Sequence, residues 1–405
     1  MEDRQAAKRS TVCAAPVDAA FERRSLPSIV VLVMGLAASV LDAAPPTRTP
    51  YQAVDLNPAR LTESWASGVC GGQQVGYGCY GLASSYSVSA MLWTGSADTA
   101  VDLNPAGFTW SGAEDTDGVQ QAGWGRVYYM IGGRYPYVAP YLVNYVHAML
   151  WTGSAASAVD LHPAGFAESW AYAIGGGQQV GEGRIYHYTP KKGGSYVTQS
   201  HALLWTGTAA SAVDLHPVGF TFSLAWGVGG GQQVGYGFVQ HNTNKKGGSS
   251  VAQCHALLWT GSAASVVDLN PAGFTASAAH GVGGGQQVGY GTRTDGTQHA
   301  LLWTGSAASV VDLHPAGFTS SLAFGVCGGQ QVGYGFDADG TQHALLWAGN
   351  AAGVVDLNTF LPAGFTNAVA TGIDAAGNIV GYAWSSVNRE DNHAFLWKAE
   401  EQQNN

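Results

Sequence analysis

The stretch His299–Gly335, HALLWTGSAASVVDLHPAGFTSSLAFGVCGGQQVGYG, decides the fold because nearly all of the chain after Pro50 repeats it. Three signatures recur in constant order: His-Ala-x-Leu-Trp, Asp-Leu-(Asn/His)-Pro and Gly-x-Gln-Gln-Val-Gly. Each occurs seven times when degenerate copies are counted. The tryptophans that end the first signature are 44 to 58 residues apart: Trp93, Trp151, Trp205, Trp259, Trp303, Trp347 and Trp397.

A repeat of roughly 44 residues with four short apolar runs has the size of a propeller blade. In the copy around Phe318 the runs are Ser320–Val326, Gln330–Phe336, Gln342–Trp347 and Val354–Asn358. The first three connections resemble hairpins, and the fourth, with Pro362 and Gly364, is longer. The pattern predicts strands A, B, C and D from the ring axis outward, with a D–A crossover to the next blade.

The two ends of the repeat region complement each other. The first element, Asp55-Leu56-Asn57-Pro58, is a lone D strand, and the last, His393–Trp397, is a C strand without a D strand. Pairing them closes a ring and removes exposed sheet edges, whereas a linear β-solenoid, the alternative, has no reason to end this way. The sequence predicts an all-β, seven-bladed β-propeller of four-stranded blades over residues 51–397, whose last blade is closed by the N-terminal strand. Residues 398–405 are then a C-terminal tail.

Residues 1–50 have the pattern of a signal peptide followed by a short linker. Arg23 and Arg24 precede an apolar run, Leu26–Leu41, and Ala43 and Ala44 follow it. The alternative, an uncleaved anchor, needs a run of about 20 residues, which is longer than this one. We therefore expect a secreted, periplasmic or cell-surface protein with no stable membrane span after cleavage.

The composition limits the partners. Charged residues are 11% of the chain and the formal net charge is −10, which gives no electrostatic basis for nucleic-acid binding. No CxxC or Cys/His metal spacing occurs among the five cysteines. We expect free thiols, with a Cys70–Cys79 hairpin bridge left open, a monomer, no metal and no cofactor.

The histidines and aspartates of the repeat are interpreted as structural. A catalytic or metal-binding histidine is needed once, whereas these recur in nearly every copy, so we expect them to bond backbone groups at strand ends and turns. Among the unrepeated residues, Glu114, Asp115 and Asp117 are interpreted as a polar A–B turn. Glu182 is a weaker candidate for an acid facing the rim. Of the unrepeated histidines, we favour the two in long loops over His280.

The B–C connections differ most between copies. Long insertions occupy Arg126–Tyr145, Arg184–Gln199 and Phe238–Gln253, and they are rich in tyrosine and cations. Long loops on one end of a rigid scaffold often carry binding residues, and Tyr, Arg and Lys suit an anionic ligand, a carbohydrate or a partner protein. The alternative is that the insertions only pack over the ring. The predicted binding rim comprises Arg126, Tyr128, Tyr129, Arg134, Tyr135, Tyr137, Tyr141, Arg184, Tyr186, His187, Tyr188, Lys191, Lys192, His241, Lys245 and Lys246.

At His393–Trp397 the sequence His-Ala-Phe-Leu-Trp resembles the HAF family of extracellular repeat proteins. Gly377-Asn-Ile-Val-Gly-Tyr resembles that family's Gly-x-Val-Val-Gly element, and the Asp-Leu after each tryptophan resembles its Asp-Leu-Gly. Six copies depart from the family by having Leu or Met in place of Phe. The resemblance implies an exported repeat protein and supplies no catalytic residues.

The leading functional hypothesis is a non-catalytic binding or scaffold module that uses the B–C rim, with no catalytic residue assigned. The alternative is a propeller enzyme, a glycoside hydrolase or lyase acting on polysaccharide. That alternative requires an unrepeated carboxylate pair about 5–10 Å apart on the rim.

Overall fold

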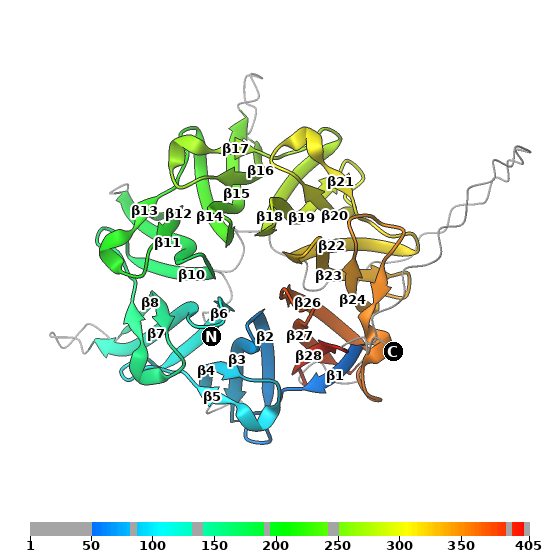
Figure 1. Cartoon of the computed structure of the whole chain (residues 1–405). Coiled ribbons are helices and arrows are strands. Elements are labelled where there is room, and N and C mark those ends of the chain that lie inside the picture. The colour runs from blue at the N-terminus through cyan, green and yellow to red at the C-terminus, as the bar shows by residue number, and fades with distance from the viewer. Residues whose placement is uncertain are drawn as a thin grey trace, which may run out of the picture. The chain divides into compact units, whose positions relative to one another are not determined.

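Seven four-stranded antiparallel sheets stand around a ring (Figure 1). The computed structural model describes residues 51–81, 87–131, 141–189, 195–241, 251–385 and 391–400. The predicted seven-bladed propeller is confirmed, with the A strand of each blade next to the axis and the D strand outside (Figure 1). The short helical turns are 3₁₀ segments: η1 (Ala97–Thr99), η2 (Ala155–Ser157), η3 (Ala209–Ser211), η4 (Ala263–Ser265), η5 (Ala307–Ser309) and η6 (Leu357–Phe360).

The blades follow one another along the chain. Blade 1 comprises β2 (Glu63–Cys70), β3 (Gln73–Tyr80), β4 (Ser87–Trp93) and β5 (Val101–Asp102). Blade 2 comprises β6 (Trp110–Thr116), β7 (Gln121–Ile131), β8 (Tyr141–Trp151) and β9 (Val159–Asp160). Blade 3 comprises β10 (Glu168–Gly175), β11 (Gln178–Thr189), β12 (Ser195–Trp205) and β13 (Val213–Asp214). Blade 4 comprises β14 (Phe220–Gly229), β15 (Gln232–His241), β16 (Val251–Trp259) and β17 (Val267–Asp268).

The remaining blades complete the ring. Blade 5 comprises β18 (Phe274–Gly283), β19 (Gln286–Arg293), β20 (Gln298–Trp303) and β21 (Val311–Asp312). Blade 6 comprises β22 (Phe318–Cys327), β23 (Gln330–Asp337), β24 (Gln342–Trp347) and β25 (Val355–Asp356). Blade 7 comprises β26 (Asn367–Ile373), β27 (Ile379–Trp384), β28 (His393–Ala399) and β1 (Tyr51–Asp55).

The N-terminal strand closes the last blade, as predicted. β1 pairs antiparallel with β28, from Tyr51 opposite Ala399 to Asp55 opposite Phe395. β28 therefore ends two residues later than the predicted boundary at Trp397. The closure joins the two ends of the propeller by hydrogen bonds between strands, so the ring has no open blade.

The glycines of the third signature form the A–B turns. In blade 5, Gly284 and Gly285 have φ of 59° and 77°, a left-handed conformation at both central residues of a two-residue hairpin turn. Farther along β19, a Cβ on Gly289 would lie 2.0 Å from the Ala278 carbonyl oxygen. Glycine is therefore required at the turn by conformation and in the B strand by contact with the A strand.

The glutamines of the same signature tie neighbouring blades together. Buried Gln287 donates from Nε2 to Gln232 Oε1 of the preceding blade at 3.0 Å and to the Gly285 carbonyl at 3.0 Å. Its Oε1 accepts the Gly305 N–H at 2.7 Å. Buried amides need such partners, so the Gln-Gln pair is structural.

The repeated histidines and aspartates form a second inter-blade contact. At the junction of blades 3 and 4, His201 Nδ1 lies 2.7 Å from Asp214 Oδ2, and Asp214 Oδ1 accepts the His216 backbone N–H at 2.8 Å. The His216 ring lies 2.8 Å from Ser223 Oγ, which accepts the Ala202 N–H at 3.0 Å. We call the four side chains of His201, Asp214, His216 and Ser223, and their equivalents, the junction network. It confirms a structural role, although the first histidine bonds a carboxylate rather than the backbone groups expected.

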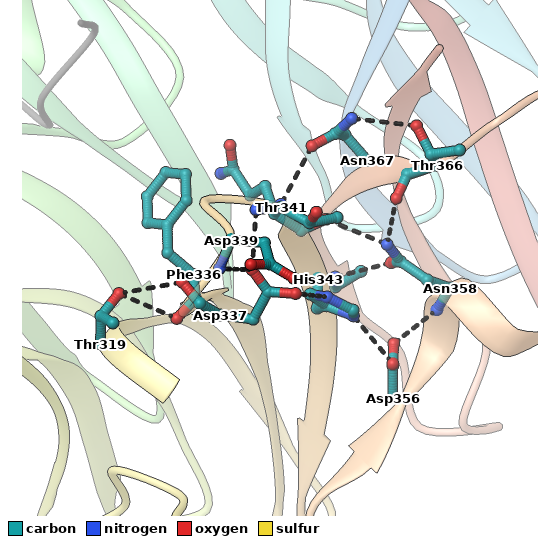
Figure 2. A network of polar contacts seen from close by, with 12 residues as sticks. Thr319, Phe336, Asp337, Asp339, Thr341, His343, Asp356, Asn358, Thr366 and Asn367 are labelled. Atoms are coloured by element: carbon teal, nitrogen blue, oxygen red, sulfur yellow. Dashed lines mark hydrogen bonds and ion pairs between the residues drawn. The ribbon is translucent and has the colours of Figure 1, made fainter. Parts of the chain in front are cut away.

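The junction network is present, with substitutions, around the whole ring. The His–Asp contact measures 2.7–2.8 Å in six blades. In blade 1, where Ser89 replaces histidine, the Tyr80 hydroxyl donates to Asp102 at 3.1 Å. Figure 2 shows the junction of blades 6 and 7, where His343 lies between Asp356 and Asp337.

Histidine and asparagine perform the same task at the second position of this network. His216 Nε2 donates to the Phe220 carbonyl at 3.1 Å, which leaves Nδ1 to accept from the serine hydroxyl. Asn104 likewise donates from Nδ2 to the Phe108 carbonyl at 3.2 Å and accepts from Ser111 Oγ at 2.8 Å. The neutral imidazole is therefore an equivalent of the asparagine amide.

Replacing the three histidines of this position with asparagine should make the protein less sensitive to acid. Burial, and then the neighbouring first histidine, lower the pKa of His162, His216 and His314 below the usual 6.5. The folded chain thus takes up these protons less readily than the unfolded chain, so stability falls as pH drops below about 6.5. The melting temperature of the triple His→Asn variant should fall less between pH 7 and 5 than that of the wild type. If the melting temperatures of the variant and the wild type fall equally between pH 7 and 5, the fold does not hold these imidazoles in the neutral form.

The cysteine bridge left open by the sequence is absent. Cys70 pairs with Gln73 beside the A–B turn, whereas Cys79 pairs with Glu63 at the other end of the same hairpin. Cys70 and Cys327 are free thiols, and burial raises the pKa of both. Within the described parts of residues 51–400, no helix is long and apolar enough to span a membrane.

Candidate functional site

Every innermost strand carries a β-bulge at the same point. In blade 5, Ala279 pairs with Gly289 and Gly281 pairs with Val288, so His280 is the extra residue. The same shift occurs in all seven A–B pairs. The extra residues are Ser67, Glu114, Tyr172, Trp226, His280, Phe324 and Thr371. We call them the bulge ring.

The bulge ring lines a cavity on the axis. The cavity has a volume of ≈ 180 Å³ and is bounded by all seven innermost strands and by every member of the ring. Each ring side chain is partly exposed, while the alanine before it is buried. A bulge re-aims a side chain, and here it turns one residue of each blade toward the axis.

One half of the cavity wall is aromatic. Trp226 stacks on His280 with ring centroids 4.0 Å apart, and Phe324 meets the other side of His280 edge-on at 4.9 Å. Behind them, Tyr236, Tyr290 and Tyr334 of the B strands lie 5.0–5.7 Å from these rings. These contacts hold the aromatic side chains of blades 4, 5 and 6 in fixed positions.

The other half of the wall is polar and acidic. It contains Thr371, Ser67, Glu114, Asp115 and Tyr172, from blades 7, 1, 2 and 3. The wall thus changes from aromatic to polar across the axis.

Two carboxyl groups are held in this polar half. Glu114 Oε1 accepts the Trp124 indole N–H at 2.7 Å. Asp115 accepts the Thr116 N–H at 2.8 Å and the Ile174 N–H of the next blade at 3.0 Å. Both residues are therefore rigidly oriented.

Burial alters the protonation of the cavity groups. It raises the pKa of Glu114, and it raises the pKa of Asp115 to about 7, because the ionised forms lose their hydration. It also lowers the pKa of His280 to about 3, so that imidazole is neutral. Within the described part of the chain, no cluster of three or more His, Cys, Asp or Glu side chains is suited to a metal ion.

The structure corrects the interpretation of Glu114, Asp115 and Glu182, and it places a further unrepeated residue, His280, at the cavity. Glu114 and Asp115 belong to β6 and line the cavity rather than forming a turn. Among the unrepeated histidines, the cavity is lined by His280, which the sequence ranked last. Glu182 does not face the rim, because it is 1% exposed and accepts from the Tyr172 hydroxyl at 3.0 Å and from Arg184 at 2.7 Å.

The described parts of the predicted B–C loops are extensions of the B and C strands. β7 and β8 stay paired from Gln121 opposite Trp151 to Ile131 opposite Tyr141, and blades 3 and 4 have similarly long hairpins. Of the predicted rim, nine residues lie on these strands: Arg126, Tyr128, Tyr129, Tyr141, Arg184, Tyr186, His187, Tyr188 and His241. Seven fall outside the described residues: Arg134, Tyr135, Tyr137, Lys191, Lys192, Lys245 and Lys246.

The rim side chains that the structure describes contact the protein itself. Arg184 lies over the Trp170 ring at 4.0 Å and donates to Glu182. The Tyr186 hydroxyl donates to Glu168. The Arg126 guanidinium lies 5.6 Å from the Trp124 ring centroid. Arg184 is therefore already neutralised by a carboxylate.

Similarity to solved structures is confined to the fold. The chain resembles the acylaminoacyl peptidase of Pyrococcus horikoshii in its uncomplexed form, with 11% identity and a TM-score of 0.50 over 84% of this chain and 52% of that one. For the orthorhombic crystal form of that peptidase the TM-score is 0.54, with 11% identity, over 86% and 53% of the two chains. The chain thus spans about half the length of these proteins. No family model and no curated protein matches the sequence.

Proposed function

We propose that this propeller is a non-catalytic binding module that holds a small ligand in its central cavity. The observation that carries the proposal is the bulge ring. In all seven blades the residue before the bulge residue is alanine, and in five blades the residue after it is glycine. The seven residues of the bulge ring are nevertheless all different. A purely structural position would repeat as the junction network does, so the variety at the cavity wall points to recognition of one asymmetric ligand.

The arrangement of the carboxyl groups favours binding over catalysis. Glu114 and Asp115 are consecutive residues of one strand, and the hydrogen bonds from Trp124, Thr116 and Ile174 fix them. Glycoside hydrolysis requires two carboxyl groups on opposite sides of the scissile bond. Consecutive residues on one wall of the cavity do not meet that requirement.

Two sequence predictions belong to the same proposal. We propose export, from the pattern of residues 1–50 and from the resemblance to the HAF family. We also propose that the long B–C hairpins of blades 2, 3 and 4 form a second contact surface for carbohydrate or a partner protein. The length of these paired strands supports the surface, and the bonding of Arg184 to Glu182 argues against that arginine as an anion site.

Filling the cavity should abolish ligand binding without unfolding the ring. In Ser67→Phe an aromatic side chain would enter the cavity, and the equivalent residues of blades 3, 4 and 6 are already Tyr172, Trp226 and Phe324. We expect the wild type to bind at least one of benzylamine, benzyl alcohol and benzoate in ligand-observed NMR, and Ser67→Phe to bind none.

Two variants control for folding and for added surface area. Thr371→Phe fills the same cavity from blade 7 and should behave like Ser67→Phe. Val218→Phe adds the same bulk at a fully exposed residue and should bind like the wild type. Absence of binding by the wild type to all three probes, or unchanged binding by folded Ser67→Phe and Thr371→Phe, would refute the central site.

A further inference from the structure

The described wall of the cavity holds two carboxyl groups and no basic side chain. Glu114 and Asp115 are the carboxyl groups on its wall, and no Lys or Arg occurs among the described residues that line it. His280 does not supply positive charge, because burial keeps its imidazole neutral at physiological pH. Arg184 is committed to Glu182 at 2.7 Å.

This lack of a counter-ion has a thermodynamic consequence. A buried carboxylate is costly unless a positive group accompanies it, and the raised pKa of Glu114 and Asp115 has burial as its largest cause. The N–H donors from Trp124, Thr116 and Ile174 satisfy hydrogen bonds and carry no full charge. A ligand with a positive charge would therefore be stabilised here by a Coulomb attraction that water screens little.

The opposite wall suits an organic body. Trp226, His280 and Phe324 form a continuous aromatic surface, and aromatic side chains bind hydrocarbon groups through apolar contact. The His280 Nε2 is buried and has no hydrogen-bond partner among the described residues. Because this nitrogen has almost no accessible surface, His280 contributes to the wall through its aromatic ring rather than through a hydrogen bond.

The volume limits the size of the ligand. At ≈ 180 Å³ the cavity is slightly larger than the dry cavity of about 150 Å³ that holds benzene in another protein. A single ring or short chain with one amino group would fill it.

Building on the binding function proposed above, we infer that the cavity takes a small organic ammonium ion, with its charge toward Glu114 and Asp115 and its apolar body against Trp226, His280 and Phe324. A free amine and the lysine side chain of a peptide share this chemistry. Either source presents an ammonium group on a hydrocarbon stem.

Isothermal titration calorimetry of the full chain with three probes of nearly equal shape tests whether the cavity selects a positively charged ligand. Benzylamine should bind at least tenfold tighter than benzyl alcohol, and benzoate should not bind. Equal affinity for benzyl alcohol would overturn the ammonium inference and leave the binding function intact. Failure of all three probes would overturn both. A lysine-containing tripeptide with blocked ends separates the sources, because it competes with benzylamine only if the cavity admits a side chain from a peptide.

Two substitutions test whether the attraction for the ammonium group comes from the carboxyl groups of the cavity. Glu114→Gln keeps the side-chain shape and an acceptor for the Trp124 indole. It should lower the affinity for benzylamine at least tenfold while leaving the affinity for benzyl alcohol unchanged. Asp295→Asn removes a carboxylate from a surface turn and should leave both affinities unchanged. If the two variants weaken benzylamine equally, the attraction is to the overall charge of the protein and the inference is wrong. If Ser67→Phe still binds benzylamine, the ammonium site lies elsewhere and the inference is also wrong.

Discussion

A chain that begins at Leu56 should lose the closure of blade 7 and at least about 3 kcal/mol of stability, as estimated from the lost strand pairing and tyrosine burial. The deletion removes β1, in which Tyr51 is buried and five residues pair with β28. It also removes Asp55, whose carboxylate lies 2.7 Å from His393 Nδ1. The measurement is the denaturant midpoint, together with hydrogen exchange of the β28 amides.

A chain that begins at Pro50 is the matched control, because it retains β1 whole. It should unfold at the same denaturant concentration as the full chain. A synthetic peptide of residues 50–58 should restore protection to the β28 amides of the shorter chain, since the closure is non-covalent. Equal midpoints for the chains starting at residues 50 and 56 would mean that blade 7 is stable with three strands.

The closure of blade 7 was predictable because counting the repeat signatures shows which strands each end of the chain lacks. The lone Asp-Leu-Asn-Pro at Asp55 and the unfinished blade at His393 are incomplete in complementary ways, and a β-edge without a partner is unfavourable. The A–B turns were predictable for a similar reason. Paired glycines such as Gly284 and Gly285 are what a two-residue hairpin turn requires.

The bulge ring was not predicted, because a bulge is a shift in pairing between two strands. Nothing in Ala279-His280-Gly281 alone shows that Ala279 and Gly281 pair with consecutive residues of β19. A signal was nevertheless present. When the seven copies of the repeat are aligned, one position between a constant alanine and a frequent glycine holds a different residue in every copy. The residues at that position line the cavity.

The length of the B and C strands in blades 2, 3 and 4 was not predicted, because insertions between repeats were interpreted as loops. The sequence Arg-Val-Tyr-Tyr-Met-Ile at Arg126–Ile131 is rich in β-branched and aromatic residues, which favour strands. The structure continues β7 through it, so the added residues lengthen the hairpin. Side-chain contacts such as Arg184 with Glu182 could not be foreseen, because they depend on which face of β11 each residue occupies.

Replacing a repeat tryptophan should destabilise the ring strongly, and the effect should depend on the blade. Trp303 is 0% exposed and packs between blades 4 and 5 against Leu258 and Leu301, so Trp303→Ala should cost about 3–5 kcal/mol. The milder change to phenylalanine separates packing from hydrogen bonding. The Trp303 indole N–H has no partner among the described residues, whereas that of Trp397 donates to the Leu357 carbonyl at 3.1 Å.

Trp397→Phe should therefore cost about 1–3 kcal/mol more than Trp303→Phe, because it leaves the Leu357 carbonyl without this donor, while Trp303→Phe removes a buried donor that is unpaired. Both changes remove the same volume from fully buried positions, so each controls for the packing loss of the other. Denaturant unfolding of the two variants under the same conditions measures the difference. Equal losses would show that the indole hydrogen bond contributes nothing net, and that the seven tryptophans act only through their size.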